Sequence, residues 1–303
     1  MALSSQLSDE IKEYKLEPYV LELETEGLTI VPPEVTGFTP EHMDRCIEVL
    51  LTEFENMTGC PITLEDGPKG ELVWPENKFP SILSDVPDPT QMLIQQLLQI
   101  DRCFRDLCVN PAVDALINHM VGNLAMSMAG SRARRLSSAN SFIKWQGDYG
   151  YGETLGLHGD QGACPLPWGT TALTANATWC LTDYTKKDGA LAYVPGSHKA
   201  NGHPVQPAAA KQAIAAECPR GSVIVWHGAT WHGAFPKLTP GLRLNAVAYY
   251  RHQSVLPQEN MKITMQDQPW DDCDNPDMMR ELIGFDDRFP YLKQTQPIPR
   301  LAK

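Results

Sequence analysis

The residues best suited to chemistry lie in the second half of the chain, where histidines and a carboxylate recur at short spacing. His158 and Asp160 are separated by a single glycine. On a strand, residues i and i+2 point to the same face, so both side chains could reach one metal ion. The segment 226–233 then offers two histidines, His227 and His232, as the third ligand. The sequence therefore predicts a metal site made of two imidazoles and one carboxylate.

Downstream residues strengthen this weak signal. A histidine–aspartate pair alone is weak evidence for a metal site, because such pairs are common and His158 is equally well explained as a loop residue. Arg243, however, follows His232 by 243 − 232 = 11 residues, and the Pro- and Gly-containing segment 236–241 between them is typical of a hairpin turn. Arg243 would then lie on a neighbouring strand, 242–252, and point into the same cavity. Its apolar neighbours indicate a buried guanidinium, which needs an anionic partner such as a carboxylate.

Two imidazoles and one carboxylate on one face of an octahedron leave the remaining coordination positions open. This is the arrangement of non-haem Fe(II) oxygenases, in which a bidentate cosubstrate and O2 bind the metal. A planar guanidinium suits a carboxylate, because it can form two parallel hydrogen bonds with it.

The elements that position these residues change character near residue 134. Before it, capping residues and apolar residues at helical spacing predict helices that begin near Pro40, Asp88 and Pro111. After it, short β-like runs between Gly, Pro and Asp favour an antiparallel sandwich or barrel. The predicted strands are 141–145, 170–182, 190–194, 222–226, 231–235 and 242–252, with a short helix in 207–217 and a C-terminal helix from Pro276.

We expect a single domain over residues 1–303, because no linker separates the helical part from the strands. It would comprise a mostly helical part at 1–130, a β core at 131–255, and a C-terminal helix and tail at 256–303. A chain of 303 residues buries enough surface to form a core without disulfides.

Charge and composition exclude several classes of partner. The chain has 25 Lys+Arg and 37 Asp+Glu, a net charge of −12, which argues against nucleic acid or an anionic membrane as the main partner. It contains no apolar run of the ~18 residues that a membrane span needs, and we find no secretory signal. The eight cysteines form no CxxC pair. Reduced thiols in a cytoplasmic protein are therefore expected.

A series of short motifs follows in a fixed order through the β-rich part. They are His158-Gly159-Asp160, Asp188-Gly189-Ala190-Leu191, Pro195-Gly196-Ser197-His198, Gly221-Ser222-Val223, Trp231-His232-Gly233 and Arg243. As a set, they resemble the phytanoyl-CoA dioxygenase-like family of Fe(II)- and 2-oxoglutarate-dependent oxygenases over roughly residues 130–252. The resemblance implies a mainly β fold with flanking helices, built on a double-stranded β-helix, the jelly-roll core of cupin-like proteins.

The resemblance also assigns roles to individual residues. It implies that His158, Asp160 and His232 bind Fe(II), and that Arg243 binds the distal carboxylate of 2-oxoglutarate. His227 is also followed by glycine, but only His232 keeps the family's spacing to Arg243, so we interpret His227 as a core or supporting residue. His198 is interpreted as structural.

Secondary contacts to 2-oxoglutarate are less defined, because Leu191 stands where some relatives carry a threonine. Lys144 and Asn176 are the candidates for these contacts, together with Thr178 and Asn245.

The reaction implied by the resemblance is oxidative decarboxylation of 2-oxoglutarate by O2, giving succinate and CO2, coupled to oxidation of an unactivated C–H bond. The presence of Asp160 favours hydroxylation, desaturation or rearrangement over halogenation, since iron halogenases of similar fold replace this carboxylate with a small residue. We see no basic cluster for the phosphates of coenzyme A. We therefore expect a small or medium organic substrate, such as a natural-product intermediate, and leave a homodimer open. Aromatic residues that could line its pocket are Trp74, Trp168, Trp270 and Phe289.

Two alternatives remain open at this point. A cupin-like metalloprotein that does not use 2-oxoglutarate would keep the three ligands but have no use for Arg243. A non-catalytic jelly-roll binding protein would retain the fold without turnover, although intact ligands argue against it.

Overall fold

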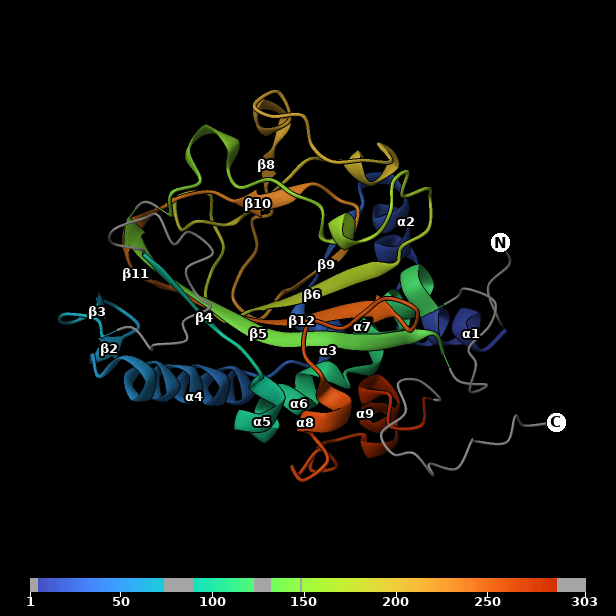
Figure 1. Cartoon of the computed structure of the whole chain (residues 1–303), viewed down its shortest axis with the longest axis horizontal. Coiled ribbons are helices and arrows are strands. Elements are labelled where there is room, and N and C mark those ends of the chain that lie inside the picture. Colours follow the sequence, from blue (N-terminus) through green and yellow to red (C-terminus); the bar gives the residue numbers. More distant parts are fainter. Residues whose placement is uncertain (1–4, 74–89, 123–131, 148, 288–303) are drawn as a thin grey trace.

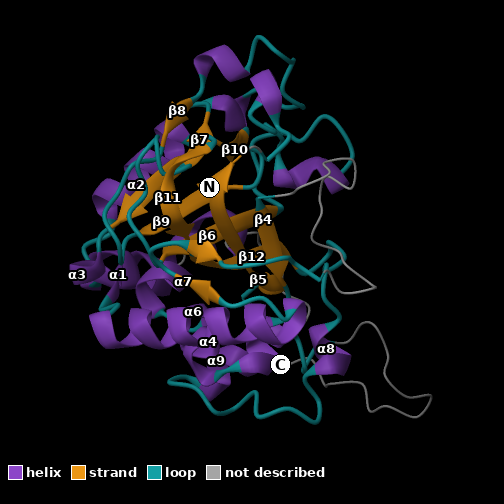
Figure 2. Ribbon diagram, turned by 90° about the vertical axis from the view of Figure 1, so that its left-hand side faces the viewer, coloured by secondary structure: helices purple, strands orange, loops and turns teal. Residues whose placement is uncertain are grey.

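Two antiparallel sheets form the β part of the molecule, and helices cover the outer face of the larger sheet (Figure 1). The computed structural model describes residues 5–73, 90–122, 132–147 and 149–287. In Figure 2, α4, α6 and α9 lie on one side of the strands, whereas β7, β8 and β10 lie on the other. Across these residues, no helix has both the length and the apolar character needed to cross a membrane. All eight cysteines are buried and free.

The larger sheet has seven strands in the order β1-β9-β6-β12-β5-β11, with β4 also paired to β5. These strands are β1 Leu28–Val31, β4 Gln91–Ile94, β5 Arg134–Gly147, β6 Thr174–Cys180, β9 Val223–His227, β11 Lys237–Arg243 and β12 Asn245–His252. The smaller sheet, in the order β10-β7-β8, comprises β7 Leu191–Tyr193, β8 Ile214–Ala215 and β10 His232–Ala234. A short hairpin joins β2 Ile62–Thr63 to β3 Gly67–Pro68.

Alternation along the strands separates a helix-facing side from a cavity-facing side. Ala175, Ala177 and Trp179 of β6 belong to the main apolar cluster, which also includes residues of the helices. Because side chains alternate along a strand, the intervening residues of β6 and β12, such as Asn176 and Tyr249, point to the opposite face. On β6 this face carries Thr174, Asn176, Thr178 and Cys180, and the site residues described below lie on this side of the sheet.

The helices are short apart from α4. They are α1 Ser5–Glu13, α2 Glu17–Glu26, α3 Pro33–Thr36, α4 Pro40–Thr58, α5 Leu97–Ile100, α6 Arg102–Cys108, α7 Pro111–Ile117, α8 Met261–Thr264 and α9 Pro276–Ile283. The predicted starts at Pro40, Pro111 and Pro276 are confirmed. In each case the preceding residue caps the helix with its side chain, as Thr39 does by accepting from the amide of His42.

The helix predicted from Asp88 is wrong. Residues 88 and 89 lie outside the described residues, and the apolar run that follows is divided into β4, α5 and α6. Met92 and Ile94 belong to the main apolar cluster, and β4 pairs with β5, so tertiary pairing decides the conformation. Asp101 then starts α6 by accepting from the amide of Cys103, which separates it from α5.

The strand predictions hold in position, but one connection differs. Residues 237–241 of the segment predicted as a turn belong to β11, which pairs with β5 at Lys237 and Leu242 and is irregular in between. His232 and Arg243 therefore lie in different sheets, on β10 and β11, rather than on neighbouring strands. The predicted helix in 207–217 is a single 3-10 turn, Ala210–Gln212, followed by β8. Strand β1 was not predicted.

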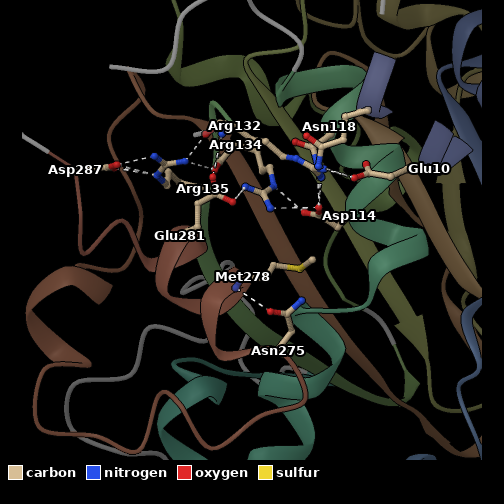
Figure 3. A network of polar contacts seen from close by, with 11 residues as sticks. Glu10, Asp114, Asn118, Arg132, Arg134, Arg135, Asn275, Met278, Glu281 and Asp287 are labelled. Carbon is tan, nitrogen blue, oxygen red and sulfur yellow. Dashed lines mark hydrogen bonds and ion pairs between the residues drawn. The ribbon is translucent and has the colours of Figure 1, made fainter. Parts of the chain in front are cut away.

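A buried ion network ties the start of β5 to three other parts of the chain (Figure 3). Asp114 of α7 accepts from Nε of Arg134 at 2.7 Å and from Nη1 of Arg132 at 2.8 Å. Arg134 also donates to Glu281 of α9 at 2.6 Å, and Arg132 reaches Glu10 of α1. Breaking a buried ion pair typically destabilises a protein by about 3–5 kcal/mol, so this network fastens the helices to the sheet.

Candidate active site

The three predicted metal ligands lie together in the structure. One ligand atom each from His158, Asp160 and His232 lies within 4.8 Å of the others, and these are the residues of the described chain that form such a group. Nε2 of His158 lies 3.4 Å from Oδ1 of Asp160, and Nε2 of His232 lies 3.3 Å from Oδ2. His232 is buried, whereas the His158 side chain is 57 % exposed, so the group opens on one side.

The donor set fits a divalent metal such as Fe(II). Nδ1 of His158 lies 2.9 Å from the carbonyl oxygen of Gly156, and Nδ1 of His232 lies 3.0 Å from that of Thr230. Because a carbonyl accepts, each Nδ1 carries the proton and each Nε2 keeps its lone pair for a metal. Burial lowers the pKa of His232, which favours the neutral, ligating form.

Main-chain hydrogen bonds hold the two histidines together. The amide of His158 donates to the carbonyl oxygen of His232 at 2.9 Å, and the reverse bond measures 2.8 Å. Asp160 is not on a strand, as we had expected, but starts the 3-10 turn Asp160–Ala163. The bridge between the histidines, rather than strand alternation, brings the carboxylate to the imidazoles.

Both glycines of the ligand motifs are required by close approach. A Cβ at Gly159 would lie 2.9 Å from the ring of Trp168, and one at Gly233 would lie 2.1 Å from the carbonyl oxygen of Leu155. The indole of Trp168 and the main chain at Leu155 thus pack directly against the segments that carry the ligands.

Two side chains hold the carboxylate of Asp160. Asn176 Nδ2 donates to Oδ2 at 2.5 Å, and Trp226 Nε1 donates to the same oxygen at 3.3 Å. Burial alone would raise the pKa of Asp160, but the neighbouring imidazoles, first His232 and then His158, lower it to about 2. The carboxylate is therefore ionised throughout the neutral range and available as a ligand.

His227 lies outside this group, which agrees with its interpretation as a supporting residue. Its Nδ1 accepts from the amide of Ala229 at 3.0 Å and so closes the turn between β9 and β10. Its ring lies 5.4 Å from that of His198. Ser197, beside His198, accepts from the amide of Trp231 at 2.8 Å, so the Pro195–His198 motif supports the strand that carries His232.

Arg243 is buried in an unusual electrostatic setting. It is 4 % exposed, and its Nη1 donates to the hydroxyl of Tyr184 at 2.7 Å. Lys144 of β5 is its direct cross-strand partner and is 3 % exposed. Neither cation has a carboxylate partner among residues 5–73, 90–122, 132–147 and 149–287. Two like charges opposite each other destabilise a sheet, so this pair is arranged for an anion.

The aromatic rings around this pair reinforce the argument. The Lys144 ammonium lies 4.2 Å from the ring centre of Tyr149 and 5.1 Å from that of Tyr151. Burial, and secondarily the charge of Arg243, lowers the pKa of Lys144 well below its usual value. A carboxylate placed between Lys144 and Arg243 would favour the charged form of Lys144, and so oppose the effects of burial and of the neighbouring positive charge on its pKa.

The metal group and the cation pair lie at opposite ends of one strand face. On β12, Asn245 donates to the Tyr184 hydroxyl at 3.1 Å, and the Tyr249 hydroxyl donates to the carbonyl oxygen of Asp160 at 3.1 Å. These residues are four positions apart, so their backbones are ~13 Å apart. The guanidinium of Arg243, a five-carbon dicarboxylate and a metal with its ligands can span this length.

Comparison with known proteins agrees with this site. The model of the phytanoyl-CoA dioxygenase (PhyH) family matches residues 88–245, more than half of the chain. The chain belongs to the phytanoyl-CoA dioxygenase family. The matched residues include His158, Asp160, His232 and Arg243, so the predicted resemblance is confirmed.

Individual relatives of this PhyH-family chain have low sequence identity to it. Dioxygenase af480 of Aspergillus fumigatus is 29 % identical over 177 residues, which cover 57 % of this chain and 53 % of that protein. The match thus spans about half the length of that relative.

Solved structures share the fold. HygX of Streptomyces hygroscopicus, crystallised with nickel and 2-oxoglutarate, gives a TM-score of 0.55 at 17 % identity, covering 80 % of this chain and 88 % of HygX. The non-heme alpha ketoglutarate dependent epimerase SnoN from nogalamycin biosynthesis gives 0.53 at 17 % identity, covering 85 % and 90 %. These similarities confirm the predicted jelly-roll core with flanking helices.

Sequence reasoning missed two residues of the site, Tyr184 and Trp226. Neither belongs to a short chemical motif, and an isolated aromatic residue has no spacing that distinguishes it from a core residue. Of the aromatic residues proposed to line the pocket, Trp168 packs against the ligand segment, whereas Trp270 packs against Phe285 on the helical side. Trp74 and Phe289 lie outside the described residues.

Proposed function

We propose that this protein is an Fe(II)- and 2-oxoglutarate-dependent oxygenase that oxidises an unactivated C–H bond of a small or medium organic molecule. His158, Asp160 and His232 bind the iron, and Arg243 and Lys144 bind the distal carboxylate of 2-oxoglutarate. The observation that carries the proposal is the combination of an open two-histidine, one-carboxylate group with two buried cations that lack an anion.

Each residue has a definite task in this proposal. Bound iron would supply the activation of O2 that couples decarboxylation of 2-oxoglutarate, with release of succinate and CO2, to substrate oxidation. The Tyr184 hydroxyl orients the guanidinium of Arg243 by accepting from Nη1, which leaves Nε and Nη2 for a carboxylate. The rings of Tyr149 and Tyr151 beside Lys144 would limit the access of water to its ammonium group.

The substrate class follows from family and fold. HygX has been crystallised with hygromycin B, and SnoN with nogalamycin RO, so neighbours of this fold bind natural products. Asp160 is retained as a ligand, which favours hydroxylation, desaturation or rearrangement over halogenation. An intermediate of secondary metabolism is therefore our proposed substrate.

The test is a titration of 2-oxoglutarate into the anaerobic Fe(II) protein, followed by measurement of succinate formed on admission of O2. We expect binding in the native protein and no succinate from the His232→Ala variant. His227→Ala is the matched control, because it removes an imidazole outside the metal group. A native Fe(II) protein without affinity for 2-oxoglutarate would favour the cupin-like alternative.

A further inference from the structure

We propose that Cys180 and Cys218 form an oxidisable pair of thiols, which a hydroperoxide converts into a disulfide that weakens the binding of an anion at Arg243. The pair is therefore a site of reversible modification beside the predicted cosubstrate pocket. This inference rests on the proposed function in that the anion is 2-oxoglutarate, whereas formation of the disulfide does not depend on it.

The two sulfur atoms are already in contact. Sγ of Cys180 lies 3.6 Å from Sγ of Cys218. Cys180 is the last residue of β6, and Cys218 lies between β8 and β9. A disulfide bond is about 2.05 Å long, so its formation requires the sulfur atoms to approach by about 1.5 Å. Both thiols belong to one buried apolar cluster together with Tyr184, and in a close-packed interior such a movement displaces the neighbours.

Tyr184 connects the thiol pair to the anion site. The main chains of Tyr184 and Cys218 exchange two hydrogen bonds, both 2.9 Å long. The hydroxyl of Tyr184 accepts from Arg243 at 2.7 Å and from Nδ2 of Asn245 at 3.1 Å. Asn245 is in turn the cross-strand partner of Cys180. A change at either cysteine therefore reaches the hydroxyl that orients the guanidinium of Arg243.

The two thiols differ in a way that suits stepwise oxidation. The hydrogen bond from Cys180 lowers the pKa of Cys218, whereas burial raises the pKa of Cys180. Cys218 is also the more accessible of the two, at 9 % exposed compared with 0 %.

The reaction consumes two thiols and one hydroperoxide. The Cys218 thiolate attacks the peroxide oxygen, which breaks the O–O bond, releases an alcohol and leaves a sulfenic acid; with hydrogen peroxide the alcohol is water. The sulfur of Cys180 then attacks that of Cys218, which forms the S–S bond and releases water. The positive charge of Arg243 favours the thiolate of Cys180 in this second step. The two thiol protons end in the alcohol and the water, so the step needs no further reductant or oxidant.

The first experiment follows the disulfide by mass. The full chain is treated with hydrogen peroxide before any metal is added, so that no metal consumes the oxidant, and its peptides are mapped without reduction. We expect a linked peptide pair that contains Cys180 and Cys218 and is separated by dithiothreitol. Cys218→Ala should lack this species. Cys60→Ala is the matched control, because this buried thiol donates to a carbonyl oxygen rather than to sulfur. Oxidation confined to other cysteines, or no oxidation, would overturn the proposal.

The second experiment titrates 2-oxoglutarate calorimetrically into the Mn(II) complex of the reduced and the oxidised protein. Mn(II) is used because it favours oxygen ligands over thiolates. Loss of one hydrogen bond to a charged group lowers affinity about tenfold or more, so we expect about a tenfold fall on oxidation. Tyr184→Phe should show this fall when reduced and no further fall when oxidised, because the effect passes through the hydroxyl. Native affinity in the oxidised protein, or a second fall in Tyr184→Phe, would overturn the proposal.

The reciprocal effect gives an independent measurement. Because coupling between two sites is mutual, bound 2-oxoglutarate must disfavour the disulfide by the same factor. In mixtures of reduced and oxidised glutathione, saturating 2-oxoglutarate should raise the reduction potential of the pair, by about 30 mV for a tenfold effect. An unchanged potential would contradict the coupling.

Failure of this inference and failure of the proposed function are distinguishable. If the reduced Mn(II) protein does not bind 2-oxoglutarate, the proposed function is refuted, while the peptide map still decides whether the disulfide forms. If the reduced protein binds 2-oxoglutarate but the disulfide is absent or without effect, only the present inference is refuted.

Discussion

Replacement of Arg243 by alanine tests whether this residue binds the distal carboxylate of 2-oxoglutarate. In the native protein, Nη1 of this arginine is engaged by Tyr184, whereas its Nε has no partner among the described residues. The side chain therefore retains the two parallel N–H groups that bind a carboxylate as a fork. Arg243→Ala removes this fork and leaves Lys144 as the single buried cation at this end.

The expected loss of 2-oxoglutarate affinity follows from the burial of the pair. Truncation of one partner of a buried, hydrogen-bonded charge pair costs about 2–5 kcal/mol. At ~1.4 kcal/mol per factor of ten, affinity should fall roughly 30- to 4000-fold. The lower part of this range is expected, because removal of Arg243 also relieves its repulsion of Lys144, which can then bind the carboxylate as a point charge. Arg243→Lys should recover only part of the affinity, because an ammonium lacks the planar fork.

The assay consists of two anaerobic calorimetric titrations, first Fe(II) into the protein and then 2-oxoglutarate into the Fe(II) complex. Fe(II) affinity should be unchanged in Arg243→Ala, since the guanidinium is not a ligand. Arg45→Ala is the charge-matched control, because it removes the same charge from an exposed ion pair on α4. Native 2-oxoglutarate affinity in Arg243→Ala would place the cosubstrate elsewhere and refute the assignment of this pocket.

Further predictions concern the metal group, the buried lysine and the stability of the fold. His227→Ala should retain Fe(II) and His232→Ala should lose it; the opposite result in a metal titration would exchange their roles. Affinity for 2-oxoglutarate should be constant below the lowered pKa of Lys144 in the free protein and then fall by at most about tenfold per pH unit, because binding above that pKa takes up a proton. Lys144→Met should abolish this slope in titrations over a pH series. Burial raises the pKa of Glu259 from 4.5 to about 7, so the folded state holds this proton more tightly. The free energy of unfolding should therefore fall by about 3 kcal/mol as pH rises from about 4.5 to about 7, and urea unfolding of Glu259→Gln should lack this component. Asp114→Asn should lower the free energy of unfolding by about 3–5 kcal/mol, because Arg134 stays buried with one of its two carboxylate partners removed; a change below 1 kcal/mol in urea unfolding would contradict this.

The grouping of His158, Asp160 and His232, which the structure brings together, could be predicted from the sequence because its signal is local. His158 and Asp160 are two residues apart, and His232 keeps a fixed spacing to Arg243. The reason given for that spacing was nevertheless wrong. The segment between His232 and Arg243 crosses from one sheet to the other, and sequence periodicity cannot show which sheet a strand joins.

The residues that the sequence could not reveal depend on pairing between distant strands. Trp226 reaches Asp160 because β9 pairs with β6 in one particular register. Tyr184 reaches Arg243 because the two segments meet in the folded chain, although they are 59 positions apart in sequence. Similarly, β4 was predicted as helix because four apolar-rich residues fit either period, and the partner strand β5 decides between them.

The pairing of β1 with β9 has a consequence for shortened forms of the protein. β1 forms the outer strand of the large sheet, with Leu28 opposite Trp226 and Val31 opposite Val223. A chain that began after Val31 would expose the main-chain hydrogen-bonding groups of β9, a strand whose described residues are all buried. Exposed apolar strand edges promote association between molecules. The N-terminal residues thus protect the sheet from aggregation, and their removal would disturb the strand that carries the indole beside the metal group.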